Sequence, residues 1–348
     1  MYLKNKKNIH IISIGGSVMH DLAINLKKNG YNITGSDDII YDPSKTRLKK
    51  NGILPKKLGY SKVNIHSKID LVIIGMHTKI NNVELLESKN KNIPILSYPE
   101  YINILSENKH RIVIAGSHGK TTITSMVMHV LRDNNIKFDY VIGAKTRNFN
   151  SNISISDNPL IIIEGDEYLT SPLDKTPKFL KYNHHIVLIN GIEWDHFNVF
   201  KSLKKYKEQF QKLIEMTPKG GEIIYYENDE SITEILNNHH DENIVLRPYK
   251  IEKYNQSEVI DNKGNILGKI SNSIDSIGSI INNNIVDISG RIILNSDKKE
   301  IFNFGKYKNQ IVSNVFKSNP EYYHWIMKSD FPQHTKKKFT EIKLRGIS

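Results

Sequence analysis

A glycine- and lysine-containing turn, AGSHGKTTIT at residues 115–124, has the residue types that bind phosphate groups. Gly116 and Gly119 would open the backbone around the phosphates of ATP, Lys120 would neutralise the β and γ oxygens, and the hydroxyl of Thr121 would reach Mg²⁺. An ordinary turn with a solvated lysine is the alternative interpretation. The expected ATP-contacting residues are Gly116, Ser117, His118, Gly119, Lys120, Thr121 and Thr122.

Two further segments place polar side chains directly after apolar runs. LIIIEGDEY carries Glu164, Asp166 and Glu167, and HHIVLINGIEWDH carries Asn190, Asp195 and His196. Such side chains could hold Mg²⁺ directly or through water if both runs are parallel strands, because the carboxyl ends of parallel strands share one sheet edge. Acidic residues after a strand are also common as turn or helix-capping residues.

A second glycine turn lies near the start of the chain, in IHIISIGGSVMHDLA. Gly15 and Gly16 would let backbone N–H groups approach a diphosphate at a helix N-terminus. Asp37, some 20 residues further on, stands where an acidic side chain can meet a ribose hydroxyl. A plain tight turn between a strand and a helix is the alternative.

The elements that must position these residues alternate between strand and helix. Apolar runs are expected as strands at IHIIS, YNITG, DLVIIGMHT, IPILS and RIVIAG, and the spacing of Leu22, Ala23 and Leu26 predicts a helix between the first two. A second helix is predicted from residue 121, with Ile123 and Val127 on its apolar side. The fold class is therefore α/β with parallel sheets.

Composition limits the class of protein. The 348 residues are 38% hydrophobic and 25% charged, which predicts several globular domains, and no apolar run reaches the roughly 20 residues that a membrane span needs. We expect a cytoplasmic protein without membrane insertion, because the N-terminal segment does not resemble a signal peptide. The absence of cysteine excludes disulfides and thiolate metal sites, so any metal should be a hard ion such as Mg²⁺.

Positive charge is concentrated at the C-terminal end. The chain has a net charge of +12, and residues 291–348 hold 12 Lys and Arg against 5 Asp and Glu. Tyr322, Tyr323 and Trp325 lie among lysines in this segment and could stack nucleic-acid bases. They could equally form the core of a small domain whose lysines are solvated.

The motifs together resemble the Mur ligases of peptidoglycan synthesis and recycling. IHIISIGGSVMHDLA, GSD, GMHT, SYPEY, AGSHGKTTITSM, EGDEY and NGIEWDH follow the order and spacing of that family over about residues 8–235. The resemblance is strongest to the branch that joins UDP-N-acetylmuramate to L-alanyl-γ-D-glutamyl-meso-diaminopimelate, and a near relative adds L-alanine alone. It implies an ATP-dependent amide ligase that forms an acyl phosphate.

The resemblance also assigns roles to individual residues. Lys120, Glu164 and His196 would be catalytic, and Thr121, Glu164 and His196 would hold the metal. Asn190 and Asp195 would support them. The UDP-sugar would be bound by Gly15, Gly16, Ser17, Asp37 and His77.

The expected domains follow the same resemblance. We expect a Rossmann-like UDP-sugar domain at 1–107, a P-loop-type ATP-binding domain at 108–240, an irregular hairpin and linker at 241–284, and a small basic α+β domain at 285–348. The family's histidine-asparagine segment and amine-binding C-terminal domain are not found after residue 240, so full ligase activity of this chain alone is an open question.

The C-terminal segment resembles a different family. FNFGKYKNQ and PEYYHWIMKSDFP are similar to the accessory C-terminus of DNA polymerase III epsilon-like exonucleases. No paired-carboxylate exonuclease core precedes them. Nucleic-acid binding through this basic tail is therefore the alternative function.

Overall fold

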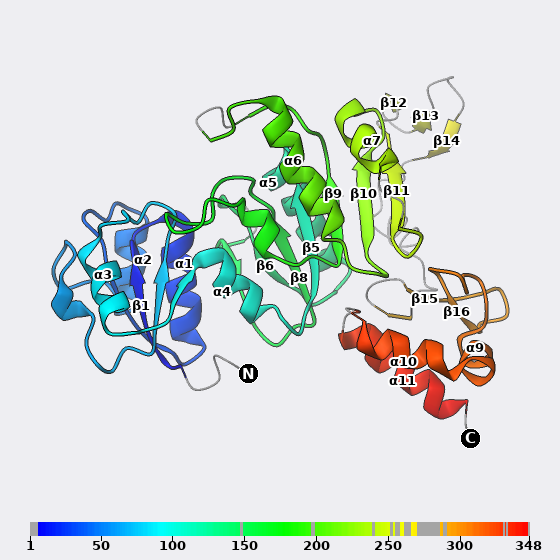
Figure 1. Ribbon diagram of the computed structural model, residues 1–348, viewed down its shortest axis with the longest axis horizontal. Helices are drawn as coiled ribbons and strands as arrows, with labels where there is room; N and C mark the ends of the chain where they lie inside the picture. The colour runs from blue at the N-terminus through cyan, green and yellow to red at the C-terminus, as the bar shows by residue number, and fades with distance from the viewer. Residues whose placement is uncertain are drawn as a thin grey trace.

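The structure is a computed structural model, and it describes residues 6–146, 149–195, 199–238, 241–250, 253–254, 258–260, 266–269, 286–287, 291–329, 331 and 333–346. Three bodies follow one another along the long axis of the molecule (Figure 1). The first two are α/β units with parallel sheets, which confirms the predicted fold class. No helix in these ranges combines the length and the apolar character that a membrane span requires.

The N-terminal body is a four-stranded parallel sheet in the order β2-β1-β3-β4. Its central strands are buried on both faces, as in parallel sheets covered by helices: β3 is a continuous apolar run, and in β1 the buried His10 stands between isoleucines. The strands are β1 (Asn8–Ile12), β2 (Asn32–Ser36), β3 (Leu71–Ile74) and β4 (Ile95–Ser97), and the helices are α1 (Ser17–Lys28), α2 (Ser44–Lys50), η1 (Lys62–Asn64), α3 (Val83–Asn90) and α4 (Tyr98–Leu105).

The helices of this body begin where their sequences predict. α1 starts directly after Gly16 and buries Leu22, Ala23 and Leu26. α4 starts with a reciprocal capping box, in which Ser97 and Glu100 satisfy each other's backbone N–H groups. The first glycine turn therefore joins a buried strand to a helix, as expected.

The middle body is a seven-stranded sheet in the order β11-β10-β9-β5-β8-β6-β7, in which only β7 runs antiparallel to its neighbour. Because β5 pairs with both β8 and β9, the segments that follow these three strands meet at one edge. The strands are β5 (His110–Ala115), β6 (Asp139–Val141), β7 (Ile153–Ser154), β8 (Leu160–Glu164), β9 (Ile186–Ile189), β10 (Glu222–Tyr226) and β11 (Val245–Tyr249). The helices are α5 (Lys120–Asp133), η2 (Lys178–Lys181), α6 (Leu203–Glu215) and α7 (Glu230–Asn237).

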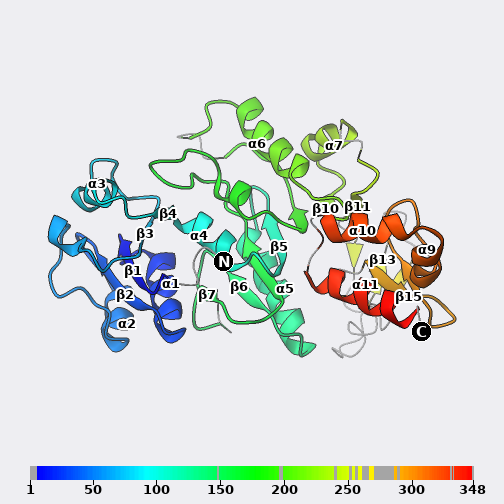
Figure 2. The same ribbon diagram turned by 60° about the horizontal axis from the view of Figure 1, so that its bottom comes forward.

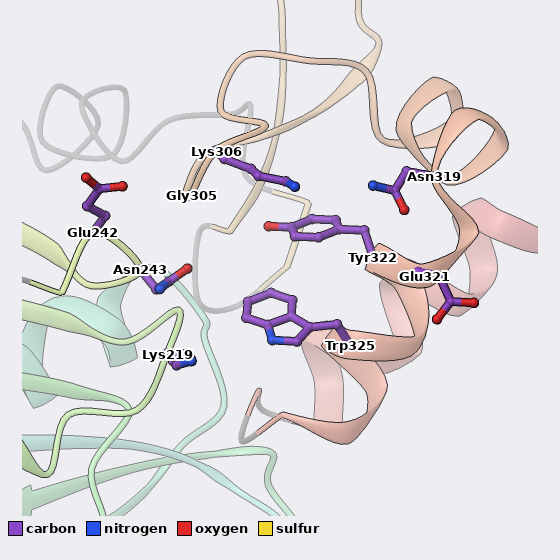
Figure 3. A pocket seen from close by; sticks show the side chains of 9 residues that line it. All are labelled: Lys219, Glu242, Asn243, Gly305, Lys306, Asn319, Glu321, Tyr322 and Trp325. Carbon is purple, nitrogen blue, oxygen red and sulfur yellow. The ribbon is translucent and has the colours of Figure 1, made fainter.

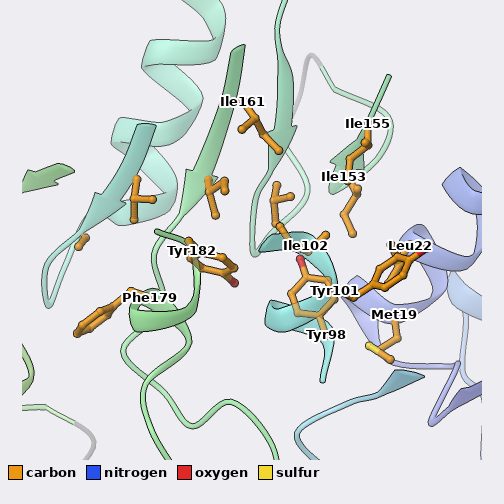
Figure 4. Packing of buried hydrophobic residues seen from close by; sticks show 14 of the residues in the cluster. Met19, Leu22, Tyr98, Tyr101, Ile102, Ile153, Ile155, Ile161, Phe179 and Tyr182 are labelled. Atoms are coloured by element: carbon orange, nitrogen blue, oxygen red, sulfur yellow. The ribbon is translucent and has the colours of Figure 1, made fainter. Parts of the chain in front are cut away.

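The first two bodies share a buried apolar junction. Met19 and Leu22 of α1 and Tyr101 of α4 belong to the same buried cluster as Ile153 and Phe179 of the middle body (Figure 4). Polar contacts add to it: the N–H of Asn152 donates to Asp21 Oδ2 at 2.7 Å, and the fully buried Asp21 is paired with Arg47 at 2.5 Å. The sequence gives no signal for this junction.

The C-terminal body is small and mixes strands with helices. β15 (Ile292–Leu294) and β16 (Glu300–Phe302) form an antiparallel pair, and α9 (Val312–Ser318), α10 (Pro320–Lys328) and α11 (Gln333–Arg345) pack beside it (Figures 1 and 2). This arrangement agrees with the predicted α+β class of the tail.

The segment after residue 240 differs from the expected linker. β11 pairs with β10 as an edge strand of the middle sheet, so that sheet continues to Tyr249 and past the expected boundary at 240. The polar and basic residues of RPYK give no apolar pattern from which this strand could be predicted, because an edge strand needs little apolar burial. Further along, β12 (Lys253–Tyr254), β13 (Glu258–Ile260) and β14 (Ile266–Lys269) form a small antiparallel sheet, in line with the expected hairpin.

Candidate functional site

The loop between β5 and α5 has a backbone shape that glycine adopts most readily. Gly116 has a φ of 126° and Gly119 a φ of 70°, both in the left-handed region. A Cβ atom on Gly116 would lie 1.7 Å from Asn190 Oδ1. Asn190, which follows β9, also donates a hydrogen bond from Nδ2 to the carbonyl oxygen of His118. Asn190 thus fixes the loop from the neighbouring strand.

Lys120 is the first residue of α5, and its ammonium group lies back over the loop. Nζ donates to the carbonyl oxygens of Gly116 at 2.8 Å and Ser117 at 3.2 Å, and it lies 2.8 and 3.0 Å from the two carboxylate oxygens of Glu167. Glu167 is fully buried, and the Lys120 side chain is 13% exposed. All three donors of the ammonium group thus have oxygen partners, and a bound phosphate would have to replace one of them.

Two other residues of the loop have different surroundings. Ser117 is buried, and its hydroxyl donates to the Glu193 carbonyl at 2.7 Å, accepts from the Glu193 N–H at 2.8 Å and contacts Tyr206 Oη at 3.0 Å. His118 is exposed, with Nε2 3.1 Å from Glu193 Oε2. The side chain of Ser117 therefore anchors the loop, and its backbone N–H adds to this by donating to the Gly191 carbonyl oxygen at 3.0 Å. Thr122 is exposed on the first turn of α5.

Thr121 joins the loop to the end of β8. Its hydroxyl donates to Glu164 Oε1 at 2.8 Å, and the N–H of Gly143 donates to Glu164 Oε2 at the same distance. A hydroxyl and a carboxylate side by side are hard oxygen ligands, and Mg²⁺ in nucleotide sites commonly takes one or two such ligands together with phosphate oxygens and water. The pair fits Mg²⁺, although no group of three or more His, Asp and Glu suited to a metal occurs in the described part of the chain.

Of the two remaining residues predicted at this edge, Asp195 and His196, the structure describes Asp195. Asp195 is half-buried, and its charge, after burial and the charge of Glu167, contributes to raising the pKa of Tyr206. His196 lies outside the described residues. Of the three residues predicted to converge, Lys120 and Glu164 lie at the same edge, linked through Thr121, and the place of His196 stays a prediction.

A cavity of about 510 Å³ opens at the first glycine turn. Its wall includes all the residues predicted to bind a sugar nucleotide, namely Gly15, Gly16, Ser17, Asp37 and His77. Thr170 and Lys178 of the middle body complete the wall. The cavity therefore lies between the two α/β bodies and faces the segment that follows β8.

Asp37 is held tightly against the glycine turn. Oδ2 accepts from the Gly15 N–H at 2.8 Å, and Oδ1 accepts from the Asp38 N–H at 2.9 Å and from Tyr60 Oη at 3.3 Å. Burial raises the pKa of Asp37, and these hydrogen bonds oppose the rise. A Cβ on Gly15 would lie 2.8 Å from Asp37 Oδ2, so glycine is what allows this approach.

The segment after β8 carries one more ion pair, between Asp166 and Lys178. Their side chains are 2.6 Å apart, and Asp166 Oδ1 also accepts from the Tyr168 N–H at 3.0 Å. Burial alone would raise the pKa of Asp166, but the charge and hydrogen bond of Lys178 together with the Tyr168 N–H hold it below the usual value.

Some residues of the site carry no signal in the sequence. Tyr60 belongs to no motif, Gly143 follows a short strand, and Lys178 opens a short 3₁₀ helix within a polar segment. Tertiary contacts alone bring them to the cavity or to Glu164. In contrast, every described residue that was singled out by a strand-turn-helix pattern lies at the predicted edge.

Comparison with known proteins identifies the first two bodies. The model of the Mur ligase family catalytic domain matches residues 8–110, and that of the Mur ligase middle domain matches residues 114–279. Residues 8–279 belong to the Mur ligase family. These boundaries agree with the two parallel sheets, and the second match extends over the strands after residue 240.

The relatives of these Mur domains include curated ligases of two kinds. UDP-N-acetylmuramate–L-alanyl-γ-D-glutamyl-meso-2,6-diaminoheptandioate ligase of Haemophilus influenzae is 34% identical over 233 residues, which cover 66% of this chain and 51% of that protein. UDP-N-acetylmuramate–L-alanine ligase of Dictyoglomus turgidum is 34% identical over 232 residues, covering 67% and 48%. The chain thus spans about half the length of the curated relatives it matches.

Solved structures agree with the Mur assignment. UDP-N-acetylmuramate:L-alanyl-γ-D-glutamyl-meso-diaminopimelate ligase from Neisseria superposes with a TM-score of 0.68 at 26% identity, over 78% of this chain and 90% of that one. UDP-N-acetylmuramate–alanine ligase from Thermotoga maritima gives a TM-score of 0.59 at 18% identity, over 91% of this chain and 78% of that one, and so supports the fold alone.

The C-terminal body matches a separate family. Residues 302–330 match the exodeoxyribonuclease X-like C-terminal domain, in agreement with the resemblance of this segment to exonuclease C-termini. Its aromatic side chains pack inward: Tyr322 lies against Phe302 at 5.5 Å between ring centres, Tyr323 against Phe316 at 5.3 Å, and Trp325 against Phe331 at 5.8 Å. This packing favours the core interpretation of the aromatic residues over base stacking.

A second cavity, of about 620 Å³, lies where the C-terminal body meets the middle Mur domain (Figure 3). Tyr322 and Trp325 stack on each other on one side of it, with ring centres 5.1 Å apart, and Lys219 lies on the other. Two lysines and two glutamates line it, so its charge is balanced. A cavity for nucleic-acid phosphates should instead have a positive excess.

Proposed function

We propose that the chain is the substrate-activating part of a Mur-type ligase that acts on UDP-N-acetylmuramate and ATP. An oxygen of the sugar's carboxylate attacks the γ-phosphorus of ATP, the bond to the bridging oxygen breaks, and ADP leaves. The nitrogen of an incoming neutral amine then attacks the acyl carbon, phosphate departs with the C–O electron pair, and the nitrogen gives one proton to the departing phosphate or to water, so that the amide remains. The amine would be L-alanine or the L-alanyl-γ-D-glutamyl-meso-diaminopimelate tripeptide, as in the relatives named above.

One observation carries this proposal. The start of α5 and the cavity with Gly15 and Gly16 are both linked to one short segment, residues 164–167, because Thr121 contacts Glu164 and Lys120 contacts Glu167. The same segment reaches the cavity through Lys178. A phosphate donor on the loop and an acceptor in the cavity would therefore meet beside these residues.

The proposed reaction needs no nucleophile from the protein. The reaction joins two anions, so it depends on charge neutralisation and alignment. Lys120 would bind the β and γ oxygens, and the N–H groups of the loop at the start of α5 would bind the remaining phosphate oxygens. Thr121 and Glu164 would hold Mg²⁺, which supplies further neutralisation of the phosphates when bound.

The cavity suits the second substrate for a related reason. Backbone N–H groups at the N-terminus of α1 would donate to a diphosphate, and Asp37 would accept a hydrogen bond from a ribose hydroxyl. Since ATP and UDP-sugars are cytoplasmic metabolites, we place the reaction in the cytoplasm.

The test is a direct incubation of the purified chain. UDP-N-acetylmuramate and Mg-ATP are supplied with L-alanine, with the tripeptide or with neither, and the products are followed by mass spectrometry and phosphate release. We expect sugar-dependent release of phosphate, and a conjugate with one of the two amines. The double variant Lys120→Met/Glu167→Gln, which removes the lysine and the buried charge it neutralises, is the control.

The outcomes separate the candidate functions. Binding of both nucleotides without phosphate release would replace the ligase proposal with a nucleotide-binding role. Binding of neither nucleotide would overturn both proposals.

A further inference from the structure

The charges around the sugar-nucleotide cavity are unusual for a site that would take a multiply anionic ligand. Asp37 and Asp38 are acidic, and Lys178 is the single lysine or arginine among the described residues of its wall. The backbone at Gly16 and Ser17 can serve a diphosphate. Among the described residues of the wall, the ammonium group of Lys178 is therefore the full positive side-chain charge that a second anionic group of the ligand can meet.

Lys178 is held in a defined position. It is the first residue of η2, and its N–H donates to the Tyr168 carbonyl at 2.9 Å. Its Nζ donates to Asp166 Oδ2 at 2.6 Å, and its side chain is 20% exposed. An ammonium group has three donors. The contact with Asp166 uses one, so the group can also donate to a ligand in the cavity.

The position of Lys178 relative to the phosphate loop follows from the chain. Glu164 contacts Thr121, Asp166 contacts Lys178 and Glu167 contacts Lys120. Two residues of extended chain span at most about 7 Å, so these contacts are close together. Lys178 therefore stands on the cavity side of the same acidic segment that holds the ATP-binding residues.

We propose that Lys178 binds the carboxylate of the sugar nucleotide and positions it beside the phosphate loop for phosphorylation. The inference rests on the proposed function and adds a specificity residue to it: Lys178 distinguishes a sugar nucleotide that bears a carboxylate from one that does not. Asp166 offsets part of the lysine's charge, which leaves the carboxylate oriented and still nucleophilic.

The experiment measures binding of two sugar nucleotides by calorimetry. UDP-N-acetylmuramate has the carboxylate, and UDP-N-acetylglucosamine lacks it. We expect Lys178→Met to weaken binding of the first about 10- to 100-fold, as for a lost charged hydrogen bond, and to leave binding of the second unchanged. Lys178→Arg should recover part of the loss, because it keeps the charge and changes the geometry.

Lys181 offers a matched control. It lies on the same short helix, pairs with Asp174 and is 25% exposed, but it does not line the cavity. Lys181→Met should bind both sugar nucleotides as the wild type does. If Lys178→Met fails to fold because Asp166 loses its partner, the double variant Asp166→Asn/Lys178→Met removes the unpaired charge, and it should fold yet still bind UDP-N-acetylmuramate weakly.

Each outcome decides between the proposals. Equal weakening of both sugar nucleotides would mean that Lys178 serves the diphosphate, and no weakening of either would mean that its pair with Asp166 is structural, so both results overturn the inference and leave the ligase proposal standing. Failure of the wild type to bind either sugar nucleotide would overturn the proposed function and the inference with it.

Discussion

Replacement of Lys120 should damage both folding and nucleotide binding, and the structure shows how to separate the two effects. The ammonium group of Lys120 neutralises the fully buried carboxylate of Glu167. Lys120→Met leaves that carboxylate buried without its cation, which costs roughly 3–5 kcal/mol of the free energy of unfolding when one partner of a buried pair is removed. Loss of activity in this variant alone would therefore be ambiguous.

The double variant Lys120→Met/Glu167→Gln resolves the ambiguity. A neutral glutamine at 167 has no charge to bury, so we expect the double variant to recover all but about 1–2 kcal/mol of the loss. Glu167→Gln alone should cost about 1–3 kcal/mol, because Lys120 keeps its hydrogen bonds to Gly116 and Ser117. The cycle thus predicts a coupling energy of about 4–5 kcal/mol, which is the amount by which the two single costs together exceed the cost of the double variant.

Two assays complete the cycle. Urea denaturation gives the free energy of unfolding of each variant, and phosphate release with UDP-N-acetylmuramate and Mg-ATP gives the activity. The double variant should be folded yet lose at least about a hundredfold in phosphate release, because no cation meets the γ-phosphate. A stable single variant, with a loss below about 1 kcal/mol, would refute the role of the buried pair, and a folded double variant with normal phosphate release would refute the role of Lys120.

Three further predictions follow from buried or strained groups. Gly116→Ala should abolish Mg-ATP binding and lower the free energy of unfolding, measured by urea denaturation, by about 1–3 kcal/mol more than Gly59→Ala does. Both glycines have a positive φ, but of the two only Gly116 has a neighbouring side chain that an added Cβ would collide with. Equal losses in the two variants would contradict this. Burial, and then the charge of a neighbouring arginine, lowers the pKa of His184 from 6.5 to about 3. Between these two pH values the unfolded chain binds more protons than the folded chain, so the free energy of unfolding falls as the pH falls through this window. The loss from His184 between pH 7 and pH 5 should be about 2 kcal/mol, and an equally steep loss in His184→Gln would argue against it. Arg291 is 1% exposed, and its nearest carboxylate among the described residues, on Glu222, is 3.7 Å away. Because Glu222 has a second arginine partner, Arg291→Met should leave the free energy of unfolding unchanged or raise it by about 1 kcal/mol. A loss above about 2 kcal/mol in thermal denaturation would refute this.

The sequence predicted the parts of the site that local geometry dictates. Gly116, Gly119 and Lys120 are recognisable because a left-handed turn between a buried strand and a helix restricts the residue types that fit. Gly15 and Asp37 are recognisable for the same reason, since a close approach to the backbone leaves no room for a side chain. These constraints act within a few residues or at a fixed spacing along the chain.

The boundary after residue 240 could not be predicted in this way. β11 contains Arg247 and Pro248, which are unusual in a strand, and its register with β10 is an edge pairing that needs few buried side chains. The apolar periodicity that marks the other strands is therefore absent there. A long-range hydrogen-bond ladder, and not local preference, adds this strand to the sheet.

The order and identity of the motifs, read without coordinates, determined the Mur ligase assignment, the α/β class and the position of the two glycine turns between a strand and a helix. Only the tertiary structure decided that Lys178 lines the cavity at the first glycine turn, that Glu167 holds Lys120 and that the aromatic residues of the tail pack against its apolar core. The physical reason is the range of the interactions. Turn and helix preferences depend on neighbouring residues, whereas an ion pair between distant segments or a shared apolar core exists only once the chain has brought those segments together.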